Sequence, residues 1–238
     1  MNGFTINDYS HANEGKVKQA IKDIFITYSQ EDAGFKCNID EEDLICSMNF
    51  KTEALIKHLK RSRVVEFDDC IILGDTAVKL MLKLHQLSSG TVITEEGERL
   101  IIDDSKAQKI KETFKGQKIA IFYVYQSERD LLCRIFPNWT ESPEEFQQSE
   151  DKVFISQVRK AREGVRLDTA EAIIFYDLEY SYLSYEQGRN RILSKERQTP
   201  AKVYFMLSNC GIDSDVLEAV RNKQDFTASY YRLKYGRF

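Results

Sequence analysis

Residues 118–124, KIAIFYV, form an apolar run of the length expected for one buried β-strand. Three more such runs follow, at residues 153–156 (VFIS), 172–176 (AIIFY) and 203–207 (VYFML). Helical patterns separate the runs, and strands that are apolar on both faces and alternate with helices are typical of a parallel sheet covered on both sides. The sequence therefore predicts an α/β fold with a helix-flanked parallel sheet.

The connections between these runs carry helix signals. Ser127, with Asp130 three residues later, predicts a helix that ends near Phe136. A polar loop is expected over residues 137–148. Further helices are expected over residues 105–114, 182–193 and 213–222.

The first hundred residues show helical periodicity with irregular connections. Candidate helices cover residues 16–25 and 52–59. A third helix has Asp75 as its candidate N-cap and ends where a Ser-Ser-Gly run, residues 88–90, interrupts the apolar spacing. This part of the chain is therefore predicted to be mainly helical.

A hairpin is expected where the helical part meets the α/β part. The runs TVI at residues 91–93 and LII at residues 100–102 flank the polar turn EEGE at residues 95–98. We therefore expect two domains: a helical extension with this linker hairpin over residues 1–100, packed on an α/β domain over residues 101–238.

The composition narrows the classes of function. A net charge of −4 argues against a protein that coats nucleic acid through charge alone, although it leaves room for a local basic groove. The chain has no apolar run of about 18 residues and no secretory signal, which predicts an intracellular protein without a membrane partner. Its 5 cysteines form no CxxC pair, and its 3 histidines lack metal-ligand spacing, so no metal site is expected.

The stretch SYEQGRNR at residues 184–191 places a glutamine and two arginines on or near one helix. Arginine suits phosphate, because its planar fork donates paired hydrogen bonds and keeps its charge. Such a donor can neutralise the charge that develops during phosphoryl transfer. The alternative is a solvated basic helix end, and Lys195 and Arg197 fit either interpretation.

The stretch SQVRKAREGVRL at residues 156–167 joins the end of a predicted strand to a basic loop that contains a glycine. Open α/β folds bind ligands at the carboxyl ends of their strands, so this loop is a candidate ligand site. The alternative is a surface loop with a turn glycine.

Taken together, in this order and at this distance, the two stretches resemble motifs V and VI of superfamily-2 helicases. The likeness is to the C-terminal, second RecA-like domain of Swi/Snf-like helicases of the phage and prophage type. Residues 118–124 resemble motif IV, and residues 79–90 with Ser105 and Lys106 resemble the helix and linker that precede it. The resemblance covers about residues 75–230 and rests on the ensemble of motifs.

The resemblance implies that the chain is half of an ATP-driven motor on double-stranded DNA. It implies an N-terminal RecA-like domain as partner, in cis or in trans, with ATP and Mg²⁺ bound only when that domain is present. A cytoplasmic location in a bacterial host, with a phage gene as one source, goes with it.

The resemblance also implies roles for matched residues. The catalytic candidates are Arg191, Arg189 and Arg197 as arginine fingers, with Gln187 orienting them. The nucleotide-binding candidates are Gly164, Arg162, Glu163 and Gly188. The DNA-binding candidates are Ser156, Gln157, Arg159, Lys160 and Tyr123.

One departure from the family pattern concerns the fingers. Motif VI usually places two arginines three residues apart, beginning four residues after its glutamine. Arg191 matches the first position, but Ser194 occupies the second. Either Arg189 or Arg197 compensates, or the finger chemistry is weakened. The rival interpretation is a non-enzymatic module that keeps the half-motor fold and binds DNA or protein.

The sequence also lacks a G-x-x-x-x-G-K-[ST] loop, so nothing in it is expected to cradle the β- and γ-phosphates. The acidic run DEED at residues 40–43 superficially resembles a Mg²⁺-binding motif, but no apolar strand precedes it, and we expect a solvated turn there. The isolated chain is therefore predicted neither to bind ATP tightly nor to hydrolyse it.

Overall fold

The computed structural model describes residues 13–21, 33–67, 70–161 and 165–236. Its contacts divide the chain into two compact units, Met1–Lys36 and Cys37–Phe238. In the first unit, the described helix is α1 (Glu14–Ile21); the end of the helix expected over residues 16–25 lies outside the described residues. All other elements named below belong to the second unit.

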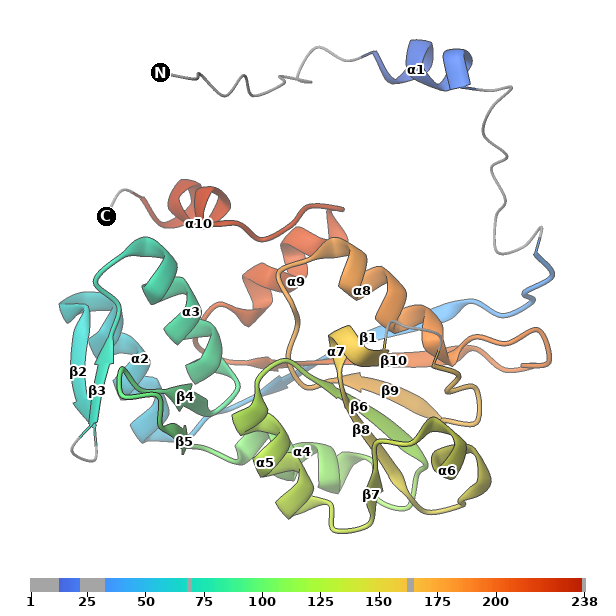
Figure 1. Ribbon diagram of the computed structural model, residues 1–238, viewed down its shortest axis with the longest axis horizontal. Helices are drawn as coiled ribbons and strands as arrows, with labels where there is room; N and C mark the ends of the chain where they lie inside the picture. Colours follow the sequence, from blue (N-terminus) through green and yellow to red (C-terminus); the bar gives the residue numbers. More distant parts are fainter. Residues whose placement is uncertain (1–12, 22–32, 68–69, 162–164, 237–238) are drawn as a thin grey trace. The chain divides into compact units, whose positions relative to one another are not determined.

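A six-stranded sheet forms the centre of the second unit (Figure 1). Its strand order is β1-β10-β9-β6-β8-β7, and every neighbouring pair is parallel. The four strands expected from the apolar runs are β6 (Ile119–Tyr123), β8 (Val153–Gln157), β9 (Ala172–Phe175) and β10 (Ala201–Ser208). The predicted α/β fold class is confirmed.

Two strands that the sequence did not reveal form the edges of this sheet, β1 (Ile39–Cys46) and β7 (Trp139–Thr140). Strand β1 pairs with β10 over its whole length. The expected solvated turn at residues 40–43 is therefore wrong. An edge strand gains its backbone hydrogen bonds from one neighbour and tolerates charged side chains, so it needs no apolar run.

Helices cover both faces of the sheet. Figure 1 shows α8 (Tyr182–Arg189) and α9 (Asp213–Arg221) on one face, and α4 (Ser105–Thr113) and α5 (Gln126–Ile135) on the other. The strand residues alternate between the two cores: Phe122 packs with α8 and α9, whereas Ile121 packs with α4 and α5. This alternation explains why the apolar runs of the sequence are continuous.

Local details differ from the expected helix starts. Helix α5 begins at Gln126, after the N-cap Tyr125. The backbone amide of Tyr125 donates to Glu128, so Glu128 makes the cap expected of Ser127. The expected polar loop contains β7 and a helix, α6 (Pro143–Gln148), whose first turn is capped by Ser142. The sequence did not reveal β7 and α6, because both elements are too short to show periodicity.

Between β1 and α4, the described part of the chain forms two helices and two hairpins. The helices are α2 (Phe50–Ser62) and α3 (Ala77–Ser88); the hairpins pair β2 (Val64–Phe67) with β3 (Cys70–Leu73) and β4 (Thr91–Ile93) with β5 (Arg99–Ile101). The N-cap of α3 is Thr76 rather than Asp75. The expected stop at Gly90 is confirmed: its φ is +83°, and a Cβ there would lie 2.1 Å from the carbonyl oxygen of Asp103.

The position of β1 differs from the expected domain division. Strand β1 precedes residue 100 and belongs to the central sheet, so the α/β part draws on residues before the expected boundary. The boundary at residue 100 itself stays a prediction. The last helix, α10 (Ala228–Tyr235), packs against α3, with Tyr231 buried.

Candidate functional site

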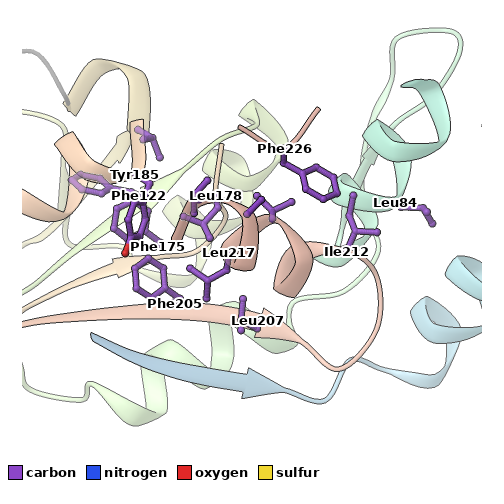
Figure 2. Packing of buried hydrophobic residues seen from close by; sticks show 14 of the residues in the cluster. Leu84, Phe122, Phe175, Leu178, Tyr185, Phe205, Leu207, Ile212, Leu217 and Phe226 are labelled. Atoms are coloured by element: carbon purple, nitrogen blue, oxygen red, sulfur yellow. The ribbon is translucent and has the colours of Figure 1, made fainter. Parts of the chain in front are cut away.

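Helix α8 carries most of the predicted arginine-bearing stretch. Ser181 caps its first turn by accepting a hydrogen bond from the amide of Ser184. Gly188 is buried against the sheet, and a Cβ at this position would lie 2.9 Å from the ring of Phe175. Figure 2 shows Phe122, Phe175 and Phe205 gathered near Tyr185. The close approach at Gly188 fixes where the arginines after it emerge.

Arg189 lies between two carboxylates. One of its terminal nitrogens donates to Glu41 at 2.6 Å, and its fork donates to both oxygens of Glu186 at 3.1 Å. Its guanidinium also lies over the Tyr185 ring, 5.4 Å from the centroid. Burial opposes the charge, but the bonds to Glu186 and Glu41 outweigh it and raise the pKa of Arg189 above its ordinary value. The guanidinium of Arg189 is thus held by two carboxylates of the same chain, those of Glu41 and Glu186.

Arg191 lies beyond α8 in a short 3-10 turn, Asn190–Ile192. It is half-buried, and this burial lowers the pKa of its guanidinium. Its carbonyl oxygen accepts a hydrogen bond of 3.1 Å from the amide of Leu167. Leu167 ends the second predicted stretch, so the structure brings the two stretches together at this bond. Within the described residues, Gln187 makes no hydrogen bond to Arg189.

Arg197 has a different role. Its guanidinium donates to the carbonyl oxygens of Asp168 at 3.1 Å and Ala170 at 3.2 Å, and to that of Thr199 at 3.1 Å. These carbonyls belong to the loop before β9 and to the chain before β10. Arg197 therefore holds two loops together through their backbones, an arrangement that no spacing rule in the sequence signals.

The predicted DNA-binding stretch lies at the carboxyl edge of the sheet, as the sequence indicates. The amide of Gln157 donates to the carbonyl of Val124 at 2.8 Å, and Arg159 donates to Glu179 at 2.6 Å. The side chains of Arg159 and Lys160 are 70% and 63% exposed, so both can meet an anion from solvent.

Other predicted site residues are less accessible or lie outside the described part. Tyr123 is fully buried, and burial raises its pKa to about 12. Ser156 is also buried. Because both side chains are buried, they can support a nucleic-acid contact only by packing under the surface residues that make it. Three nucleotide-binding candidates lie outside the described residues: Arg162, Glu163 and Gly164.

A buried polar cluster, absent from the sequence predictions, lies behind this edge. Nε2 of His85 lies 2.8 Å from a carboxylate oxygen of Asp177, and Nδ1 lies 2.9 Å from the hydroxyl of Tyr125. Glu128 is the second acid of the cluster, next to Asp177. Burial, together with the charge of Asp177, holds the pKa of Glu128 well above its usual range. Asp177 stays ionised, because its attraction to His85 outweighs the cost of burial and lowers its pKa.

A cavity of about 390 Å³ opens over this cluster. His85, Tyr125 and Tyr180 form part of its lining, with the pair of Arg159 and Glu179 at one side. The sequence offered one signal for the cluster: Asp177 directly follows the predicted strand at residues 172–176, at the edge where the carboxyl ends of parallel strands meet. His85 gave none, because its partner is 92 positions away.

Two further properties bear on the site. No group of histidine, cysteine, aspartate and glutamate side chains within the described residues could hold a metal ion. In the same residues, no helix is long and apolar enough to cross a bilayer.

No family model matches the sequence, and no curated protein matches it. The fold does match a solved structure, the crystal structure of the C-terminal part of the Fun30 ATPase domain. The match covers 83% of this chain and 96% of that chain, with a TM-score of 0.55 and 11% sequence identity. This chain has the fold of that ATPase part. Its sheet and flanking helices form a RecA-like arrangement.

Proposed function

We propose that the chain is the C-terminal half of an ATP-dependent DNA helicase or translocase of the Swi/Snf-like type. The observation that carries the proposal is the hydrogen bond between Leu167 and Arg191, which joins the two motif-like stretches on one side of the sheet. The likeness to the C-terminal part of an ATPase domain supports it. The phage type and a bacterial cytoplasmic location remain part of the proposal.

Among the three finger candidates, we favour Arg191, because it occupies the first arginine position of the motif VI pattern, four residues after Gln187. In the structure, Arg189 bonds the carboxylates of Glu41 and Glu186, and Arg197 bonds backbone carbonyls. Arg191 is half-buried, and its charge persists at neutral pH because an arginine pKa lies far above 7. A partly desolvated cation stabilises phosphate charge more strongly than an exposed one. Arg191 would therefore reach the triphosphate, with Gln187 and Gly188 shaping the helix behind it.

ATP and Mg²⁺ would be held mainly by the N-terminal RecA-like domain, in cis or in trans. This chain has no phosphate loop, and its described residues have no cluster of metal ligands. Closure of the two domains would bring Arg191 to the nucleotide, while Arg159 and Lys160 meet the DNA backbone.

The direct test is DNA-stimulated ATP hydrolysis by the chain alone and with its phosphate-loop domain, either mixed or fused. Hydrolysis that requires both parts supports the proposal. Hydrolysis by the chain alone, or none in the mixed and fused forms, contradicts it.

A second candidate is a non-enzymatic module that binds DNA or protein with the half-motor fold. Two observations favour it: Ser194 occupies the second finger position, and Arg189 is paired with Glu41 and Glu186. Salt dependence separates the two. A dedicated DNA-binding module should bind duplex DNA well alone and lose affinity steeply with salt, whereas a motor half should bind weakly with a modest slope. A protein-binding module should show neither.

A further inference from the structure

The edge strand β1 is tied to helix α8 through one side chain. The carboxylate of Glu41 accepts hydrogen bonds from the hydroxyl of Tyr185 at 2.8 Å and from Arg189 at 2.6 Å. Arg221 of α9 lies 3.4 Å from the other carboxylate oxygen. The Glu41 side chain is 17% exposed, so these contacts form in a partly desolvated setting. One carboxylate thus joins three elements of the unit.

The contacts continue from Glu41 to the turn that carries Arg191. Arg189 bonds Glu186, and a Glu186 oxygen accepts a further bond of 3.2 Å from the side chain of Asn190. Asn190 directly precedes Arg191 in the 3-10 turn. A continuous chain of hydrogen bonds therefore runs from the sheet edge to the residue before the proposed finger.

Glu41 and Glu186 have different roles in this series of hydrogen bonds. Glu186 lies on α8 itself, three residues before Arg189, so it moves with the helix and cannot fix the helix to the sheet. Glu41 belongs to a strand that pairs with β10 along its whole length. Among these acids, it is Glu41 that anchors the end of α8 to a rigid element.

We propose that Glu41 is a positioning residue, which holds Arg189 and the end of α8 so that the next turn presents Arg191 in a fixed direction. The contact of Arg191 with a nucleotide rests on the proposed function. The control of the turn's position by β1 does not rest on the proposed function.

Glu42 provides a matched control. It is the next residue on the same strand, so its side chain points to the opposite face. It is exposed, and within the described residues it forms no ion pair or hydrogen bond through its side chain. The substitution Glu42→Gln therefore removes the same charge from the same strand without touching α8.

The reporter is the amide of Leu167, which donates to the carbonyl of Arg191. Hydrogen exchange followed by NMR would compare the full-length chain with Glu41→Gln and Glu42→Gln, using the amide of Ile121 in the sheet centre as internal reference. Glu41→Gln should speed exchange at Leu167 about tenfold, the effect expected when a hydrogen bond to a charged group is lost. Glu42→Gln should leave it unchanged. Exchange at Leu167 that is the same in both variants would overturn the proposal.

A second readout separates positioning from a general loss of structure. In the two-domain assembly, Glu41→Gln should lower kcat for ATP hydrolysis several-fold and leave KM for ATP unchanged, because Glu41 itself does not meet the nucleotide. An equal rise in KM, or no change in kcat, overturns the positioning role. If the wild-type assembly hydrolyses nothing, the proposed function fails, and exchange at Leu167 still decides whether Glu41 holds the turn.

Discussion

Glu41 and Arg189 lie 148 positions apart in the sequence, and in the fold their side chains meet at 2.6 Å. The contact joins an acidic edge strand to the helix that carries the arginine-rich stretch. A phosphate could bind Arg189 only by displacing the carboxylates of Glu41 and Glu186. The same contact gives the acidic strand a role in the fold.

The pair should stabilise the fold measurably. Both side chains are partly buried: the Glu41 side chain is 17% exposed and that of Arg189 is 27% exposed. We therefore expect Glu41→Gln and Arg189→Gln each to lower the free energy of unfolding by about 1–2 kcal/mol. A double-mutant cycle in urea should show a coupling of about 1 kcal/mol. The exposed pair of Asp75 and Lys79 serves as control, with a coupling below about 0.5 kcal/mol. Equal couplings for both pairs would contradict this prediction.

Gly188 should tolerate no side chain while Phe175 keeps its size. A Cβ there would lie 2.9 Å from the Phe175 ring, so we expect Gly188→Ala to destabilise the chain by about 1–3 kcal/mol. Adding Phe175→Leu makes room, so the double variant should be more stable than the sum of the two single effects. Urea unfolding of the four proteins measures this; strictly additive losses would show that the two residues do not compete for space.

The buried acid Glu128 should make stability depend on pH. Its folded-state pKa lies well above the ordinary 4.5, because of burial and the nearby charge of Asp177. Between these two pKa values the folded chain keeps a proton that the unfolded chain releases, so stability falls as pH rises, by at most about 1.4 kcal/mol per pH unit. Asp177 has the opposite shift, and its contribution is lost only in acid.

Glutamine imitates a protonated glutamate, so Glu128→Gln should flatten that fall. The free energy of unfolding, measured at about pH 5 and pH 8, should drop less in this variant than in the wild type. Glu112→Gln, an exposed site on α4, should follow the wild type. A wild-type slope that persists in Glu128→Gln would show that another group titrates.

The sequence predicted the parts of the fold that follow from periodicity. The buried strands β6, β8, β9 and β10 are continuous apolar runs, because both of their faces are covered. Strand β1 was missed because half of its side chains are charged and its stability comes from pairing with β10. Its backbone partner lies about 160 positions away, a relationship that no local pattern records.

The sequence proposed residues for the site but did not reveal their contacts. The sequence indicated that residues 156–167 and 184–191 act together, and the bond between Leu167 and Arg191 joins them. It did not reveal the contacts of Arg189 and Arg197, because the fold alone brings Glu41 near Arg189 and the carbonyl of Asp168 near Arg197. The pair of His85 and Asp177 escaped notice for the same reason.

The measurement that tests the central claim most directly is DNA-stimulated ATP hydrolysis by the two-domain assembly with Arg191→Ala. The matched control is Arg134→Ala, an exposed arginine on α5, which covers the opposite face of the sheet from α8. If Arg191 completes the ATP site, its loss should lower kcat by about 10³-fold, as for other arginine fingers, while the control keeps wild-type activity. Full activity in Arg191→Ala would contradict the account.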